Sequence, residues 1–352
     1  MRNTKIALAV LALVASTAAM AEGVTISGTL EGAVGSTNTA GSSGTYFSGA
    51  GGWVAGNKIR FSGEEDIGGG TKAVFGLEAG TDLNGYANNG GGTYGGTSTT
   101  QSGAGLFSRE ASVGLANDNL GTIKLGRQLS PTVLNYAVNG TLGNGHFWVN
   151  RIANVGGGHV AGSGTLAYEG FWVDNAITYT SPSLGGVSIY AMKQMVNSNT
   201  NGTINSGAAN DSYTSIAAST SLSGVNLGVG YEKRADTFQN TALNANTKFG
   251  DFSLAGSYHS NKTTSTNVTL NSYSVEAGYN ITEPLMVMVQ YATNNAATQS
   301  KLTGLSLKYA MSKRTFAYAT IIDAKAGNSG FDSRGTAASD NRTSLVGVAH
   351  SF

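Results

Sequence analysis

The stretch Val24–Val34, VTISGTLEGAV, alternates apolar and polar side chains with a period of two. Ile26 and Leu30 fall on one face of this stretch, whereas Thr25 and Glu31 fall on the other. Successive side chains of a β-strand point to opposite sides of the sheet. The pattern therefore predicts a strand with one face in an apolar medium and the other in water.

The same alternation recurs to the end of the chain. It predicts sixteen strands, near residues 23–34, 53–64, 71–82, 106–116, 121–129, 173–181, 186–197, 210–222, 225–236, 239–249, 251–261, 267–281, 284–294, 300–311, 313–325 and 342–352. Short turns and long connections rich in Gly, Ser, Thr and Asn alternate between these strands. An even number of such strands indicates an all-β fold, a transmembrane antiparallel β-barrel.

The N-terminus has the form of a secretory signal peptide. Arg2 and Lys5 precede an apolar run over residues 6–15, and Ala19-Met20-Ala21 has the small-x-small pattern of a cleavage site. The alternative, a membrane-spanning helix, needs about 20 apolar residues, more than this run supplies. We expect a signal peptide at residues 1–21 and one barrel domain over residues 22–352.

Composition narrows the classes of function. Without residues 1–21 the chain carries 19 basic and 20 acidic residues, with no Lys/Arg block that would suggest nucleic-acid binding. The absence of Cys excludes disulfides and thiol chemistry. The four His residues are scattered, and we find no catalytic triad order, metal-ligand cluster or cofactor motif. We predict neither an enzyme nor a cofactor or metal site.

Four segments resemble one family of membrane proteins. They are GEEDIGGGTKA at residues 63–73, LGTIKLGRQ at 120–128, YTSP at 179–182 and VGVAHSF at 346–352. In this order and spacing the chain resembles the general porins of the bacterial outer membrane, closest to their β-proteobacterial branch, over the whole mature length. The resemblance implies a water-filled channel for passive diffusion of small hydrophilic solutes and ions, assembled as a homotrimer among outer-membrane lipid and lipopolysaccharide.

The longest predicted connection, residues 130–172, corresponds by strand count to the third extracellular loop of that family. In the family this loop folds inward and narrows the channel, so we expect residues 130–172 to form the constriction. Arg151 and Glu169 are its only fully charged residues, and several aromatic residues accompany them. We therefore expect a weakly charged, partly aromatic constriction.

Alternation also predicts which charged residues line the channel. The predicted pore-lining residues are Lys58, Arg60, Lys72, Arg109, Lys124 and Arg127 on the wall, with Arg151 and Glu169 in the loop. For Arg109 and Arg127 the assignment rests on the resemblance, because alternation there is imperfect. Basic candidates slightly outnumber acidic ones such as Glu78, which predicts a weak preference that is, if anything, for anions.

The last strand carries a predicted assembly signal. Val346, Val348, His350 and Phe352 share one face, so the C-terminal aromatic ring would meet lipid at the periplasmic rim. In the resembling family this end is recognised by the outer-membrane assembly machinery. A different function remains open at this stage: a surface adhesion or structural barrel whose long loops are the active part.

Overall fold

The computed structural model describes most of the expected barrel domain. The described residues are 23–39, 42–49, 56–83, 87–88, 106–142, 172–195, 213–234, 238–264, 267–295, 299, 301–325 and 341–352. The predicted signal peptide lies outside them, as do residues 143–171 of the predicted constriction loop with Arg151 and Glu169.

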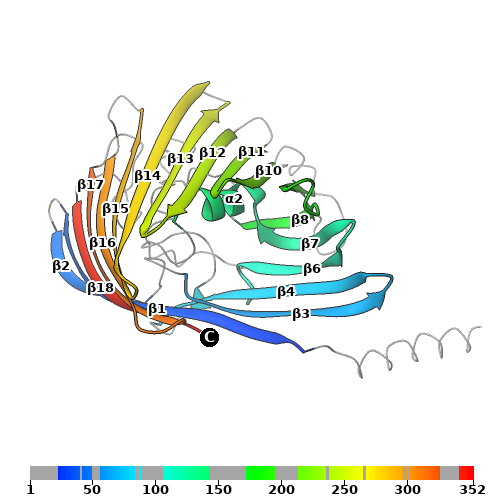
Figure 1. Cartoon of the computed structure of the whole chain (residues 1–352), viewed down its shortest axis with the longest axis horizontal. Helices are drawn as coiled ribbons and strands as arrows, with labels where there is room; N and C mark the ends of the chain where they lie inside the picture. The colour runs from blue at the N-terminus through cyan, green and yellow to red at the C-terminus, as the bar shows by residue number, and fades with distance from the viewer. Residues whose placement is uncertain are drawn as a thin grey trace, which may run out of the picture.

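Sixteen long strands form a closed antiparallel ring (Figure 1). They are β1 (Thr25–Thr39), β3 (Lys58–Gly68), β4 (Thr71–Thr81), β6 (Glu110–Asn117), β7 (Gly121–Leu129), β8 (Trp172–Thr180), β9 (Val187–Gln194), β10 (Tyr213–Leu222), β11 (Val225–Arg234), β12 (Phe238–Phe249), β13 (Phe252–Thr263), β14 (Val268–Thr282), β15 (Leu285–Asn294), β16 (Lys301–Ala310), β17 (Thr315–Lys325) and β18 (Asn341–Ser351). Each pairs with the next long strand, and β18 pairs with β1. The predicted sixteen-stranded barrel is confirmed.

Three further elements in the described residues are not predicted by the alternation. Strand β2 (Ser42–Ser48) pairs with the second half of β1, and β5 (Ala87–Asn88) pairs with the end of β4. Both sequences lack alternating apolar residues, so their pairing depends on the strand edge beside them. The third element, helix α2 (Pro131–Asn139), opens the predicted constriction loop.

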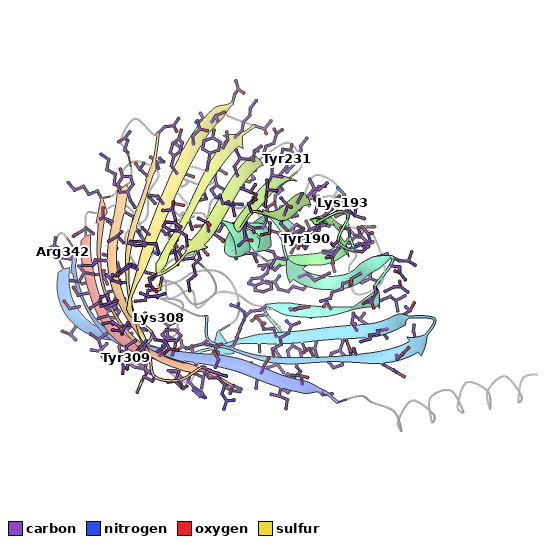
Figure 2. The ribbon with its side chains drawn as sticks, in the orientation of Figure 1. Tyr190, Lys193, Tyr231, Lys308, Tyr309 and Arg342 are labelled. Atoms are coloured by element: carbon purple, nitrogen blue, oxygen red, sulfur yellow. The ribbon has the colours of Figure 1, made fainter. Side chains whose placement is uncertain are left out.

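The two faces of the barrel differ as the alternation predicts. On the outer face Val113 is 58% exposed and Leu243 is 51% exposed. On the inner face Glu31 is 1% exposed and Asn240 is fully buried. Figure 2 shows Tyr231 pointing away from the ring and Tyr190 pointing into it. Apolar side chains face outward and polar ones inward, the arrangement required by lipid outside and water inside.

The seam that closes the ring involves the C-terminal residue. The Gly28 N–H donates to the Phe352 carbonyl at 2.9 Å, and the Phe352 N–H donates to the Gly28 carbonyl at 3.1 Å. A Cβ on Gly28 would lie 2.4 Å from Cζ of Phe352 and 2.6 Å from the Lys58 carbonyl oxygen. The ring of Phe352 therefore covers Gly28, and only glycine leaves it room.

Side chains of the same chain cover two glycines near the seam. Phe352 fills the space at Gly28, and a Cβ on Gly32 would lie 3.1 Å from Leu83 and 3.6 Å from Phe47. The chain's own side chains therefore occupy both positions.

Substitution of Gly28 by Ala should destabilise the closed barrel. The new methyl group would displace the Phe352 ring and press on the Lys58 carbonyl, at a cost of about 1–3 kcal/mol. Urea unfolding of detergent-refolded protein measures the effect. Gly304→Ala is the matched control, because its Cβ would meet nothing closer than 3.4 Å. Equal stability of the two variants would contradict the proposed packing at the seam.

Candidate functional site

Four basic side chains and two carboxylates gather on the inner face of neighbouring strands. Arg60 on β3, Glu78 on β4 and Glu110 on β6 occupy one cross-strand row. Lys58, Arg109 and Lys124 surround that row. We call these six residues the basic wall cluster.

Ion pairs connect the whole basic wall cluster. The Arg60 guanidinium pairs with Glu110, and its Nη1 also lies 3.4 Å from Oε2 of Glu78. The Arg109 Nε donates to Oε1 of Glu78 at 2.5 Å, and the Lys58 Nζ lies 3.7 Å from Oε2 of Glu78. The Lys124 Nζ lies 3.3 Å from Oε1 of Glu110. Each carboxylate thus holds at least two basic groups in place.

A glycine makes room for the central pair. Gly76 precedes Glu78 by two residues on the inner face of β4. A Cβ on Gly76 would lie 2.5 Å from Oε1 of Glu110 and 2.8 Å from a guanidinium nitrogen of Arg60. A larger residue at this position would require the Arg60 or the Glu110 side chain to shift.

The cluster presents its positive charge to the lumen. The side chains of Glu78 and Glu110 are only 5% and 12% exposed, whereas those of Lys58, Arg60 and Lys124 are 36%, 27% and 30% exposed. With four basic groups against two acids, the cluster has a formal charge of +2. Water in the lumen therefore meets mainly ammonium and guanidinium groups.

An aromatic ring completes one side of the cluster. The Arg109 guanidinium lies 4.9 Å from the ring centre of Trp172, the first residue of β8. The ring supports the Arg109 guanidinium through a cation–π contact.

The remaining predicted wall residues lie apart from this cluster. Lys72 pairs with Glu64 beside the short β3–β4 turn. Arg127 is in register with Ala111, two residues from the outward-facing pair Leu125 and Val113.

The guanidinium of Arg127 donates to Asp174 at 2.7 Å and to the Ser108 carbonyl at 2.6 Å. Asp174 is itself 59% exposed. A bulge in the β7–β8 pairing, next to Gly126 with φ of 118°, accompanies this arrangement. The structure therefore places Arg127 toward the outer side of the wall, not in the lumen cluster as predicted.

One member of the cluster was missed by the sequence analysis. Glu110 was not among the predicted channel residues. The signal was present, because Ser112 and Gly114 share its parity while Val113 and Leu115 take the other. The run of residues before Glu110 lacks alternation and obscured where the strand begins.

Helix α2 lies inside the ring, beside β10 (Figure 1). Ser130 caps it by accepting from the Val133 N–H at 3.3 Å, and Pro131 occupies the first turn. Both features are typical of a helix start.

The inner face of β10–β12 forms the seat of α2. Thr132 and Ser215 hydroxyls lie 2.7 Å apart, and Asn135 donates to the Ala218 carbonyl at 2.8 Å. A Cβ on Gly228 would lie 2.0 Å from Oδ1 of Asn135. The glycine therefore allows the helix to lie directly against the backbone of β11.

The chain beyond α2 continues along the inner wall. The Leu142 N–H donates to Oε2 of Glu276 on β14 at 3.1 Å. The rings of Tyr136 and His259 meet edge to face with centres 5.3 Å apart. Residues 130–142 thus occupy the inner face of β10–β14, whereas the cluster occupies β3–β7.

The face around α2 is polar but its acids are covered. Glu232 is fully buried, accepting from the Tyr213 hydroxyl and from Asn240 at 3.2 Å. Glu276 is 1% exposed. These carboxylates are enclosed by hydrogen-bonding neighbours and present less charge to the lumen than the basic groups do.

The described residues hold neither a candidate metal site nor a membrane-spanning helix. Within the described segments, no group of three or more His, Cys, Asp or Glu side chains is arranged to hold a metal ion. No helix in the described part of the chain is long and apolar enough to cross a membrane.

Comparisons with known proteins agree with this architecture. The family model for Gram-negative porins matches residues 7–329. Outer membrane porin protein 32 of Delftia acidovorans is 30% identical over the full length of both chains. The structure of an anion-selective porin from Comamonas acidovorans superimposes with a TM-score of 0.72, at 21% identity, covering 94% of this chain and 99% of that one. The trimer form of OmpT from Vibrio cholerae gives 0.63 at 10% identity, covering 94% and 99%.

The family match covers most of the sequence and the relative matches all of it, and the structure adds the closed barrel with its polar interior. The chain belongs to the Gram-negative porin family and forms a channel of the bacterial outer membrane for passive diffusion of small solutes.

Proposed function

We propose that this channel favours anions weakly and that the basic wall cluster sets the preference. The observation that carries the proposal is the unequal exposure of charge: the two carboxylates are covered while the basic groups reach the lumen. A net positive wall raises the local concentration of anions within a Debye length, about 10 Å at 0.1 M salt. No catalytic step is part of this function.

The partial compensation of the positive charges supports a weak preference for anions, not the exclusion of cations. Half of the cluster's four positive charges are compensated by Glu78 and Glu110 in direct ion pairs. Lys72 is also paired, with Glu64. The solved porin from Comamonas acidovorans is described as anion-selective, which is consistent with the same sign of preference here.

We also propose that residues 130–172 narrow the channel. The support is the position of residues 130–142 on the inner wall, where α2 is hydrogen-bonded to β10 and seated on glycine of β11. Arg151 and Glu169 would then lie near the narrowest part, a role that stays a prediction.

Three further roles complete the proposal. Residues 1–21 act as a cleaved signal peptide. Val346, Val348, His350 and Phe352 serve as the signal read by the assembly machinery. All four occupy one face, where Val346 is 66% and Phe352 42% exposed. The folded protein lies among outer-membrane lipid and lipopolysaccharide as a homotrimer, and OmpT of Vibrio cholerae has been solved in a trimer form.

Neutralising the exposed lysines of the cluster should abolish the anion preference. In Lys58→Gln with Lys124→Gln, the formal cluster charge falls from +2 to about zero, so the zero-current potential in a KCl gradient should approach zero. Lys301→Gln with Lys325→Gln removes the same charge from the outer face and should leave the potential unchanged. An unaltered potential in the cluster variant would show that other groups set selectivity. The wild-type preference should also weaken as salt concentration rises.

Displacing α2 from its seat should alter conductance. Gly228→Leu places a side chain where Asn135 lies, so α2 must leave the wall and single-channel conductance should change and fluctuate. Gly304→Leu adds the same bulk to the inner face of β16, where a Cβ meets nothing closer than 3.4 Å, and should have a smaller effect.

Deleting residues 145–168 should enlarge conductance and admit larger sugars. Unchanged conductance in the deletion variant would refute the constriction.

The trimer is testable by mild extraction. Native gels of unheated protein in non-ionic detergent should show a species of about three chains, the assembly that the family resemblance implies and in which OmpT of Vibrio cholerae has been solved. Dissociation to a single chain only on heating supports the assembly. A clean monomer under mild extraction contradicts it.

A further inference from the structure

The inner wall of β15–β17 is largely apolar, unlike the charged wall of β3–β7. Its buried apolar side chains, each at most 3% exposed, are Met288, Ala292, Leu302, Tyr318, Ile322 and Ala324. Met286 on β15 and Phe316 on β17 pack against this group and are only partly buried. The lumen therefore borders two large apolar side chains at this place.

Lys308 on β16 carries the one charge among the described inward-facing side chains of these three strands. It shares the inward parity of Ser306, whereas Leu307 and Tyr309 face lipid (Figure 2). Lys308 forms no ion pair with any described residue. Every basic residue of the basic wall cluster, by contrast, has a carboxylate partner. The charge of the Lys308 ammonium is therefore uncompensated and available to an anion.

Apolar groups flank this ammonium. The Lys308 Nζ lies 4.3 Å from the centre of the Phe316 ring, and Met286 is the cross-strand neighbour of Lys308 on β15. Its neighbour on β17, Tyr318, donates its hydroxyl to Oε1 of Glu31 at 2.6 Å. Glu31 is only 1% exposed. One positive charge beside partly exposed apolar side chains is suited to an anion that has an apolar body.

We propose that Lys308, Phe316 and Met286 form a binding site for small monocarboxylates with an apolar body, of which benzoate is an example. The carboxylate pairs with the Lys308 ammonium. The apolar body lies against Phe316 and Met286, so apolar area on both sides is removed from water. The solute binds reversibly during its passage through the channel.

The site is separate from the basic wall cluster. Lys308 lies two residues before the end of β16, and Arg60 lies eight residues before the end of β3, at the same short-turn side of the barrel. This difference corresponds to about 20 Å along an extended strand. It is about twice the Debye length in 0.1 M salt. The inference therefore goes beyond the proposed anion preference, and either can fail without the other.

The test records single channels of the full-length protein in KCl while benzoate or acetate is added. Both anions carry one carboxylate, but only benzoate has a ring to place against Phe316. Benzoate should halve the chloride current at about a tenfold lower concentration than acetate. Lys308→Gln should raise that benzoate concentration about tenfold, because the charged partner is lost. Phe316→Ala, which keeps the charge, should raise it about threefold.

Three control variants remove charge elsewhere. Lys301→Gln changes the outer face of the same strand, and Lys313→Gln changes the exposed turn that follows it. Both should respond to benzoate as the wild type does. Lys58→Gln with Lys124→Gln should also keep the benzoate response while its zero-current potential changes, which separates this site from the basic wall cluster.

The KCl current recorded before benzoate is added shows that each variant has folded. An unchanged benzoate response in both Lys308→Gln and Phe316→Ala would overturn the proposal. Equal potency of acetate and benzoate on the wild type would overturn it too, because the apolar side chains would then take no part in binding. A loss of response in Lys313→Gln as large as that in Lys308→Gln would also contradict it, since any basic group near this end would then suffice.

Discussion

The pairing of backbone hydrogen bonds around a closed ring is the constraint on which the rest of this structure depends. Hydrocarbon offers no partner for a free N–H or carbonyl, so every spanning strand must have a neighbour on both sides. The β1–β18 pairing meets this requirement, and the reciprocal bonds between Gly28 and Phe352 extend it to the last residue. Once the ring is closed, each strand necessarily has one face toward lipid and one toward an enclosed lumen.

The closed lumen brings together groups that are remote in sequence. Arg60, Glu78 and Glu110 come from three strands, yet the register places them in one row of ion pairs. Two glycines leave the space that these groups need: Gly76 lies beneath the Arg60–Glu110 pair, and Gly228 lies beneath α2. Fixed charge and an inner helix can therefore share the lumen without disrupting the strand ladder.

The outer surface changes character along the barrel axis. At the short-turn end Phe249 stacks on Phe252 with ring centres 5.8 Å apart, and Phe252 lies 4.6 Å from Tyr279. Aromatic rings at this level are typical of a membrane interface. At the opposite end β9, β11 and β13 carry Lys193, Lys233 and Lys262. The two ends of one wall are thus suited to two chemically different membrane interfaces.

The sequence by itself determined the sixteen strands, the face that each strand turns to lipid, and the lumen side for Lys58, Arg60 and Lys124. Alternation is a local pattern, so it can be recognised without knowing which strands pair. Tertiary structure decided the rest. The ion pair between Arg127 and Asp174 forms across the β7–β8 bulge. The exposure of charge in the basic wall cluster depends on register across several strands, and the seat of α2 depends on Gly228, about ninety residues away. Alternation specifies a direction for each side chain, whereas pairing, bulges and close approach of backbones are set only when distant strands meet.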